Sequence, residues 1–353
     1  MSDYYNNNQY DGGGYPPPFG NPYDRESFRD RISRRMSNPP ERGLVQLGLL
    51  TGGAILVHLV LQSLYSLVIC GSDTLYYLYI GNEQFSLICD MLYSFFCVAL
   101  PFLPLLFIEK RMNIGSGTLP YGRAYADCDV FLLITAGLGV FFIANIASSY
   151  FAAYCEMLGH GFVSYDTAVE ESLNMTNDPF TLAVTVLRTA VVPAFLEEFV
   201  FRGVVMQPLR RYGDGFAIFA SAFIFGMLHG NMTQMPFAII AGVMLGYVSV
   251  VSGSMWVNTG LHLLNNTVSV LYSAALVYAG EGKELILSSV ITYGIIIIGI
   301  IAFVFYAYRT PRMFKLYPGP YGETKGKIRL YFLMPTMLLA LLILGFTILK
   351  DIK

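Results

Sequence analysis

Nine long apolar runs, separated by short polar links, constrain this chain more than any other feature. They cover about residues 44–70, 84–108, 129–154, 181–207, 214–230, 234–252, 255–279, 286–308 and 330–349. A helix needs about 20 such residues to cross the hydrocarbon core of a bilayer. Isolated sheets would leave their backbone groups unsatisfied in lipid, and the runs are too uniformly apolar for barrel strands. We therefore predict an all-α, polytopic transmembrane helix bundle of about eight or nine spans.

The composition agrees with a membrane protein, because only 13% of the residues are charged, against roughly 25% in soluble globular proteins. Residues 1–43 differ from the rest: they are rich in Gly, Pro, Asn and Tyr and show no apolar period. We predict that they form a disordered tail. We divide the remainder into accessory membrane helices at 44–155, core helices at 181–280 and C-terminal membrane helices at 286–353. A lipid bilayer is the expected partner, and no nucleic acid is expected.

Basic residues alternate between the links in a way that predicts orientation. The tail, the link after 84–108, the link after 181–207 and the stretch 309–329 carry many Lys and Arg residues, whereas the intervening links contain only Lys283. Links rich in Lys and Arg stay in the cytoplasm. We therefore predict a cytoplasmic amino terminus, and with nine spans an outer carboxyl terminus.

Five cysteines lie in or at the ends of the apolar runs, without C-x-x-C spacing. We interpret them as buried small side chains, and a bridge between Cys70 and Cys155 stays the alternative.

Charged residues interrupt the fourth run in the sequence FLEEFVFRG, residues 195–203. Such residues are costly in a membrane and often mark function. Glu198 and Arg202 are four residues apart, so they share a helical face and can form an ion pair. Glu197 is rotated by about 100° from Glu198 and can point elsewhere. The spacing thus separates a held carboxylate from a free one.

Two further polar sets lie in neighbouring runs. His229 follows Phe225 by four residues, and His262 precedes Asn266 by four. Polar groups in lipid need polar partners, so we expect these sets and Glu197 to meet around water. At 1.5 Å per residue they lie at unequal depths, about 16 Å for Glu197, 10 Å for His262 and 22 Å for His229. We therefore expect the fifth span to tilt or to lie deeper, with a cavity between the fourth and seventh spans.

The three motifs Glu197-Glu198-x-x-x-Arg202, Phe225-x-x-x-His229 and His262-x-x-x-Asn266 occur in this order on separate apolar runs. In this the chain resembles the CPBP family of intramembrane proteases (the CAAX-protease and bacteriocin-processing, or Abi, group), which includes the type II CAAX prenyl endopeptidases. The resemblance covers about residues 181–280.

It implies an endopeptidase in which Glu197 is the general base and His229 helps to position and activate water. His262 and Asn266 would donate hydrogen bonds to the oxyanion, and Glu198 and Arg202 would hold the first carboxylate in place, with Phe225 as a supporting residue.

A zinc mechanism is the competing chemistry. Glu197, His229 and His262 form a set of one carboxylate and two histidines of the kind that zinc hydrolases use. The chain lacks H-E-x-x-H, and the three residues come from three separate helices. We favour the glutamate mechanism without a cofactor, and zinc stays the alternative.

The expected substrate is a membrane-embedded or lipid-associated peptide or protein, and the resemblance suggests the membrane of a bacterial cell. Two other functions stay open: an inactive membrane scaffold or bacteriocin self-immunity protein that keeps these residues for packing, and a transporter that uses ionisable residues to couple protons. The absence of an obvious inverted repeat disfavours the transporter.

Overall fold

The computed structural model describes residues 39–114, 119–125, 127–163, 179–279, 282–310 and 315–353. Within these ranges the regular structure is helical, apart from one isolated bridge between Phe162 and Ile352. The predicted all-α fold is therefore confirmed. Most of the predicted tail, and most of the acidic link before residue 179, lie outside the described residues. The first helix already begins at Pro40, inside the segment that we assigned to the tail.

The first half of the chain forms four long helical stretches. The first is α2 (Pro40–Cys70), which is followed by the short α3 (Asp73–Gly81). The second is α4 (Glu83–Tyr93), continued by η1 (Ser94–Ala99), η2 (Leu100–Phe102) and α5 (Leu103–Met112), and the third is α6 (Val130–Met157). The fourth is α8 (Pro179–Val186), continued by η3 (Leu187–Val191), α9 (Val192–Glu198), η4 (Phe199–Val205), α10 (Met206–Leu209) and η5 (Arg210–Tyr212). The fourth stretch ends at Tyr212, five residues beyond the predicted boundary.

The second half continues with α11 (Asp214–Met227), α12 (Met235–Ser252), α13 (Met255–Ala279), α14 (Glu284–Arg309), α15 (Lys327–Phe332) and α16 (Pro335–Leu349). The last predicted run is thus divided in two. Pro335 explains the break, because the residue before a proline is disfavoured in the helical region, and Met334 is extended with ψ 142°.

Six of the described helical stretches are long and apolar enough to cross a membrane: Pro40–Cys70, Glu83–Met112, Val130–Met157, Pro179–Tyr212, Met235–Ser252 and Glu284–Arg309. Helices α11 and α16 are apolar but shorter. Helix α13 has 25 residues and is not among the six, in keeping with the polar residues Asn258, His262 and Asn265 along it. The prediction of an integral membrane protein is confirmed.

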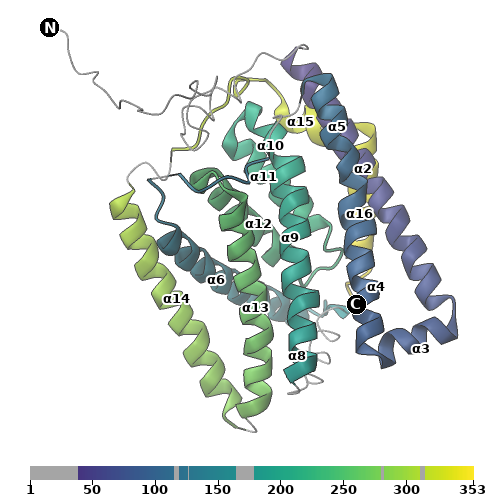
Figure 1. Ribbon diagram of the computed structural model, residues 1–353, viewed down its shortest axis with the longest axis vertical. Helices are drawn as coiled ribbons and strands as arrows, with labels where there is room; N and C mark the ends of the chain where they lie inside the picture. The colour runs from purple at the N-terminus through teal and green to yellow at the C-terminus, as the bar shows by residue number, and fades with distance from the viewer. Residues whose placement is uncertain (1–38, 115–118, 126, 164–178, 280–281, 311–314) are drawn as a thin grey trace, which may run out of the picture.

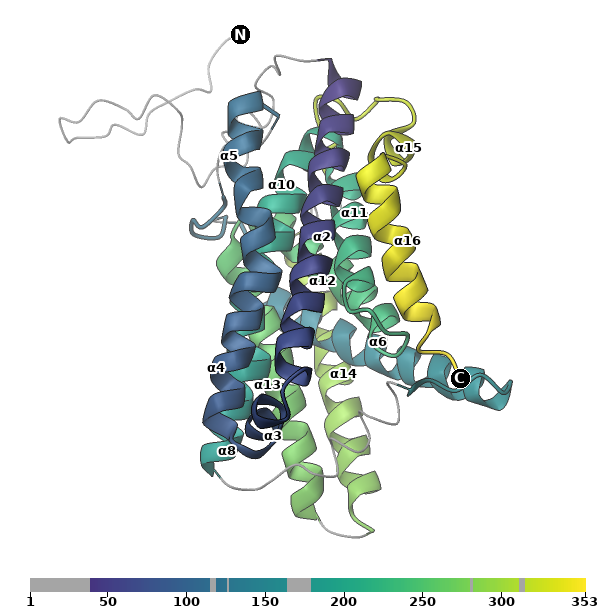
Figure 2. The ribbon, with the colours of Figure 1, turned by 90° about the vertical axis from the view of Figure 1, so that its right-hand side faces the viewer.

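The helices form one bundle in which α6 crosses α12, α13 and α14 obliquely (Figures 1 and 2). Close approach at this crossing requires glycine: a Cβ on Gly139 would lie 2.8 Å from the Cα of Gly299 on α14. On the other side of the bundle α2 packs against α16, and the α8–η5 stretch stands beside α13 (Figure 1).

The start of α2, the end of α5, η5 and the start of α15 meet at one end of the bundle, the upper end in Figure 2. Hydrogen bonds connect them there: the Tyr212 hydroxyl donates to the carbonyl of Pro40, Arg211 to that of Asn113, and Lys327 to that of Tyr212. We call this the basic end, because it gathers links that we predicted to share one side. The opposite end of α2, at Cys70, lies at what we call the far end.

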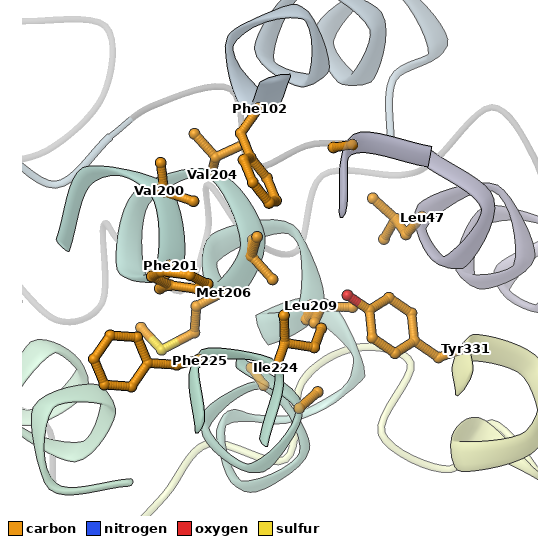
Figure 3. Close-up of a cluster of buried hydrophobic side chains, with 14 of the residues drawn as sticks. Leu47, Phe102, Val200, Phe201, Val204, Met206, Leu209, Ile224, Phe225 and Tyr331 are labelled. Atoms are coloured by element: carbon orange, nitrogen blue, oxygen red, sulfur yellow. The ribbon is translucent and has the colours of Figure 1, made fainter. Parts of the chain in front are cut away.

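A cluster of buried apolar side chains holds α2, η4, α10, α11 and α15 together (Figure 3). Phe201 lies in it between two other rings, 6.2 Å from Phe102 and 5.0 Å from Phe225. Helices α11 and α12 pack closely because a Cβ on Gly242 would meet the Cα of Ala222 at 2.9 Å, as expected for a small residue in a packing face. This packing fixes the helices that carry the polar motifs.

No disulfide joins the five cysteines, all of which are described. Cys89 and Cys97 are buried as predicted, whereas Cys70 is exposed at the far end of α2.

Candidate active site

The helix that carries the two glutamates is irregular on both sides of them. The short α9, Val192–Glu198, lies between the π-helical segments η3 and η4. Such π segments are rare and often occur at functional sites. Pro193 contributes to the irregularity, because it has no N–H to donate to the carbonyl of Thr189 four residues earlier. The chain thereby places both glutamates on one short regular turn.

Glu198 is completely buried and accepts three hydrogen bonds. Its Oε1 receives Arg202 and the Nδ1 of His262, each at 2.9 Å, and its Oε2 receives the Asn258 amide at 2.6 Å. The ion pair predicted from the i, i+4 spacing is present. Arg202 also donates to the carbonyl of Gly242 on α12 at 3.2 Å. A buried carboxylate with these partners is fully engaged and connects the fourth stretch with α12 and α13.

Glu197 differs from its neighbour in exposure and in contacts. Its side chain is 25% exposed, against 0% for Glu198. Its Oε2 lies 3.9 Å from the Nε2 of His262, which is beyond hydrogen-bond distance but a separation that an intervening water can bridge. Glu197 is thus the more exposed and the less engaged of the two carboxylates.

His262 lies between the two carboxylates. A carboxylate can only accept, so Nδ1 of His262 donates to Glu198, and Nε2 faces Glu197. If His262 carries both protons, its charge and that of Arg202 balance the two glutamates, and the buried set is neutral. This arrangement holds the imidazole ring in one orientation.

His229 follows the end of α11 and is held by its own turn. Its Nδ1 lies 2.8 Å from the carbonyl oxygen of Phe225, so Nδ1 carries the proton and a neutral His229 presents the lone pair of Nε2. Asn231 steadies the link from the other side by donating to the carbonyl of His229. His229 is therefore oriented to accept a hydrogen bond, for example from water.

The ring of Phe225 connects the motifs. Arg202 lies over it at 4.6 Å, and the rings of His229 and His262 lie edge-on to it at 4.8 and 6.2 Å. The centres of the two imidazole rings therefore both lie close to the centre of the same phenyl ring. Phe225 thus contacts residues of all three motifs, whereas the meeting of Glu197, His229 and His262 around one water stays a prediction.

Asn266 lies at the edge of this set and is half-buried. It donates to the carbonyl of Thr189 at 3.1 Å, the carbonyl that Pro193 cannot reach, and its Oδ1 accepts the amide of Asn265. One of its two N–H groups is thus used by the protein. The other makes no hydrogen bond with the described residues.

Sequence reasoning missed Asn258, Asn265 and the carbonyl groups of Thr189 and Gly242. Asn258 lies one turn before His262 on the same face of α13, and this i, i+4 spacing is the signal that could have found it. Main-chain carbonyls carry no such signal.

The residues proposed for zinc do not form a compact ligand set. Within the described residues no group of three or more His, Cys, Asp and Glu side chains is arranged to hold a metal ion. Nδ1 of His262 and of His229 are already committed to Glu198 and to a carbonyl, which is the outer arrangement that metal-bound histidines also show. The donor types fit zinc, but their arrangement does not supply a site for it.

Comparison with known protein families places the three motifs together. Residues 179–268 match the family described as Type II CAAX prenyl endopeptidase Rce1-like. The match contains Glu197, Glu198 and Arg202 on the fourth stretch, His229 after α11, and His262 and Asn266 on α13. No curated protein and no solved structure matches the chain. The chain thus carries, in its membrane helices, a region of the CPBP or CAAX-protease family of the Rce1-like type.

Proposed function

We propose that the protein is an intramembrane endopeptidase that hydrolyses a peptide bond of a membrane-associated or hydrophobic substrate, with Glu197 as the general base. One observation carries the proposal: of two adjacent glutamates, Glu198 is buried with three donors, whereas Glu197 is partly exposed and faces the Nε2 of His262 at 3.9 Å. The family match at residues 179–268 supports the same reaction class.

The reaction begins with water that hydrogen-bonds to Glu197 and to the Nε2 of His229. Glu197 takes one proton, and the resulting hydroxide attacks the carbonyl carbon of the scissile bond. The carbonyl oxygen becomes an oxyanion that accepts hydrogen bonds from His262 and from the second N–H of Asn266. Glu197 then passes its proton to the leaving nitrogen as the C–N bond breaks. The products are a carboxylic acid and an amine.

His262 suits this role because its Nδ1 is directed to Glu198, which leaves Nε2 as the nitrogen that faces Glu197. With Nδ1–H directed to Glu198, a proton on Nε2 points toward the space beside Glu197, where the oxyanion forms. Glu198, Arg202 and Asn258 do not touch the reacting atoms in this proposal. They position His262.

The test is cleavage of membrane-anchored fluorogenic peptides by the purified protein in proteoliposomes. The peptides include a prenylated CAAX peptide and a set with varied sequence beside a membrane anchor. We expect Glu197→Gln to lower kcat/KM by about 10²–10⁴-fold, the range of general-base catalysis, with unchanged thermal stability. Cleavage by Glu197→Gln at the wild-type rate would refute the proposal.

Glu323→Gln is a matched control, because Glu323 is exposed at the basic end and outside the family match. It should cleave like the wild type. Cleavage is also measured after treatment with a chelator, to separate the glutamate mechanism from a zinc mechanism. We expect chelation to leave the activity unchanged. A loss of activity that added zinc restores would assign the reaction to a metal.

A further inference from the structure

Helix α11 ends just before His229, although it is still too short at that point to cross the hydrocarbon core of a bilayer. Helix α11 has 14 residues and α16 has 15, so each is about 21–23 Å long, less than the roughly 30 Å of a hydrocarbon core. The link from α11 to α12, residues 228–234, is not helical. Non-helical backbone at membrane depth is tolerated only where it is buried in protein or lines a water-filled cavity.

Such a cavity is present. A pocket of about 750 Å³, within the range of roughly 300–1,000 Å³ typical of ligand sites, lies between this link, α2 and α16. His229 and Asn231 line it from the link, and Thr347 lines it from α16. His229 therefore contacts the ring of Phe225 and also lines this pocket. The cavity that we expected between the fourth and seventh spans stays a prediction.

The side of α2 that faces the pocket is mixed, because polar side chains stand there between Leu59 and Leu67 although α2 is a membrane span. Gln62, Ser63, Ser66 and Cys70 all line the pocket and recur at three- and four-residue spacing. The Ser63 hydroxyl donates to the carbonyl of Leu59, whereas the carboxamide of Gln62 is on an exposed side chain. Polar side chains in a span usually face water or a polar partner. No Asp, Glu, Lys or Arg is among the described residues that line the pocket.

The pocket extends toward the far end of the bundle. It reaches from Leu59 to Gly71 along α2, about 18 Å of helix, and Gly71 directly follows the last residue of that helix. The start of α2 is fixed to η5 at the basic end, where the Tyr212 hydroxyl donates to Pro40. The outer limit of the pocket is therefore at the end opposite to the one from which the amino-terminal tail leaves.

We infer that this pocket is the route by which substrate reaches His229, entering from the far end, and that it admits an extended, uncharged peptide segment. The inference rests on the proposed protease function and adds the side of entry and the class of peptide. In this inference Gln62 and Ser66 pair with the backbone of an extended peptide, and the apolar lining at Leu67 packs against its side chains. A charged segment would lose its hydration without a partner, since the lining offers no acid or lysine or arginine.

Cys70 provides a test of the side of entry that does not depend on activity. The wild-type protein with an amino-terminal epitope tag is placed in sealed vesicles and treated with a membrane-impermeant maleimide, and labelled cysteines are mapped by mass spectrometry. We expect Cys70 to react in vesicles whose tag is enclosed, because the pocket opens opposite to the tail. Reaction of Cys70 only in vesicles whose tag faces outward, or no reaction, would overturn the inference.

Blocking the pocket tests the route itself. Ser66→Trp fills the lining, and Val60→Trp places the same side chain on a part of α2 that is 59% exposed and does not line the pocket. We expect kcat/KM of the anchored peptides to fall about tenfold or more for Ser66→Trp and to stay within about twofold for Val60→Trp. If Ser66→Trp does not fold, a bulky maleimide adduct on Cys70 replaces it, with Cys70→Ser as control.

Failure of this inference is distinguishable from failure of the proposed function. If neither Ser66→Trp nor the Cys70 adduct slows cleavage while Glu197→Gln abolishes it, substrate enters elsewhere and the protease proposal stands. If Glu197→Gln cleaves like the wild type, the protease proposal itself is wrong. A final experiment varies the charge of the substrate. Peptides with Lys or Asp beside the scissile bond should be cleaved at least about tenfold more slowly than peptides of Ala, Ser and Gln.

Discussion

Two buried ion pairs lie 12 residues apart, and both have i, i+4 spacing: Glu198 with Arg202, and Arg210 with Asp214. Each is almost completely shielded from solvent. They differ in their surroundings. Asp214 is enclosed by main chain, since its Oδ2 accepts the N–H of Tyr317 while Oδ1 receives Arg210 at 2.6 Å. Glu198 instead shares its oxygens with side chains of α13, one of which, His262, faces an open carboxylate.

The comparison teaches that a buried ion pair by itself does not indicate a site. Burial of each pair costs desolvation free energy, which the interactions with close partners offset. Only the pair in the middle of the bundle has a titratable ring whose second nitrogen points away from the pair. The candidate site differs by two groups without a hydrogen bond between them, Glu197 and the Nε2 of His262, which face each other at 3.9 Å.

The largest effect is expected from breaking the central pair. Arg202→Met leaves Glu198 buried without its guanidinium, and removing one partner of a buried pair costs about 3–5 kcal/mol. We expect the free energy of unfolding to fall by that amount and cleavage to be lost. The measurement is thermal unfolding in detergent together with cleavage of the anchored peptides. Unchanged stability would show that the pair does not hold this part of the bundle.

A smaller effect, limited to stability, is expected at the basic end. Asp214→Asn keeps the shape of the side chain but weakens its bond with Arg210, a loss of about 1–3 kcal/mol for a charged hydrogen bond. The folded protein should cleave at the wild-type rate, because neither Arg210 nor Asp214 belongs to the three motifs that meet at Phe225. Comparing kcat per folded molecule with the melting temperature checks this. A fall in kcat as large as that of Arg202→Met would show that the two ion pairs do not differ in their importance for cleavage.

The smallest effect is expected from Asn258→Leu, which sharpens the comparison by removing one donor from Glu198. Asn258 is completely buried, and its Oδ1 has no hydrogen-bond partner, so an apolar side chain relieves one unsatisfied atom while losing one bond. We expect a change in stability within about 1 kcal/mol. We also expect kcat to fall about tenfold with unchanged KM, since His262 loses part of its support. A purely structural role would change stability and leave kcat as it was.

Local spacing made part of the site predictable. The i, i+4 rule identified the Glu198 pair and separated it from Glu197, and three motifs on three apolar runs indicated that their side chains meet. The partners of Asn266 and Arg202 were not predictable, because both include main-chain carbonyls on other helices, those of Thr189 and Gly242. Any residue type offers such a carbonyl.

Helix existence was predictable from apolar length, but helix ends were less so. The fourth stretch continues past Pro208 to Tyr212, and within it the buried Gln207 amide donates to the carbonyl of Arg202. Helix α11 ends at Met227, earlier than hydropathy suggested. The pocket beside His229 results from such short helices, so a hydropathy profile could not reveal it.

The carboxyl-terminal residues bear on when the site can form during synthesis. Asp351 accepts the N–H of Met232 in the link that carries His229, and its carbonyl receives the N–H of Val163. Residues 232 and 351 are separated by 119 positions, so the ribosome has made the described helices from α12 to α16 before this contact exists. The nascent chain therefore inserts these helices with the His229 link still lacking this restraint, and the link gains it only after Asp351 has been made.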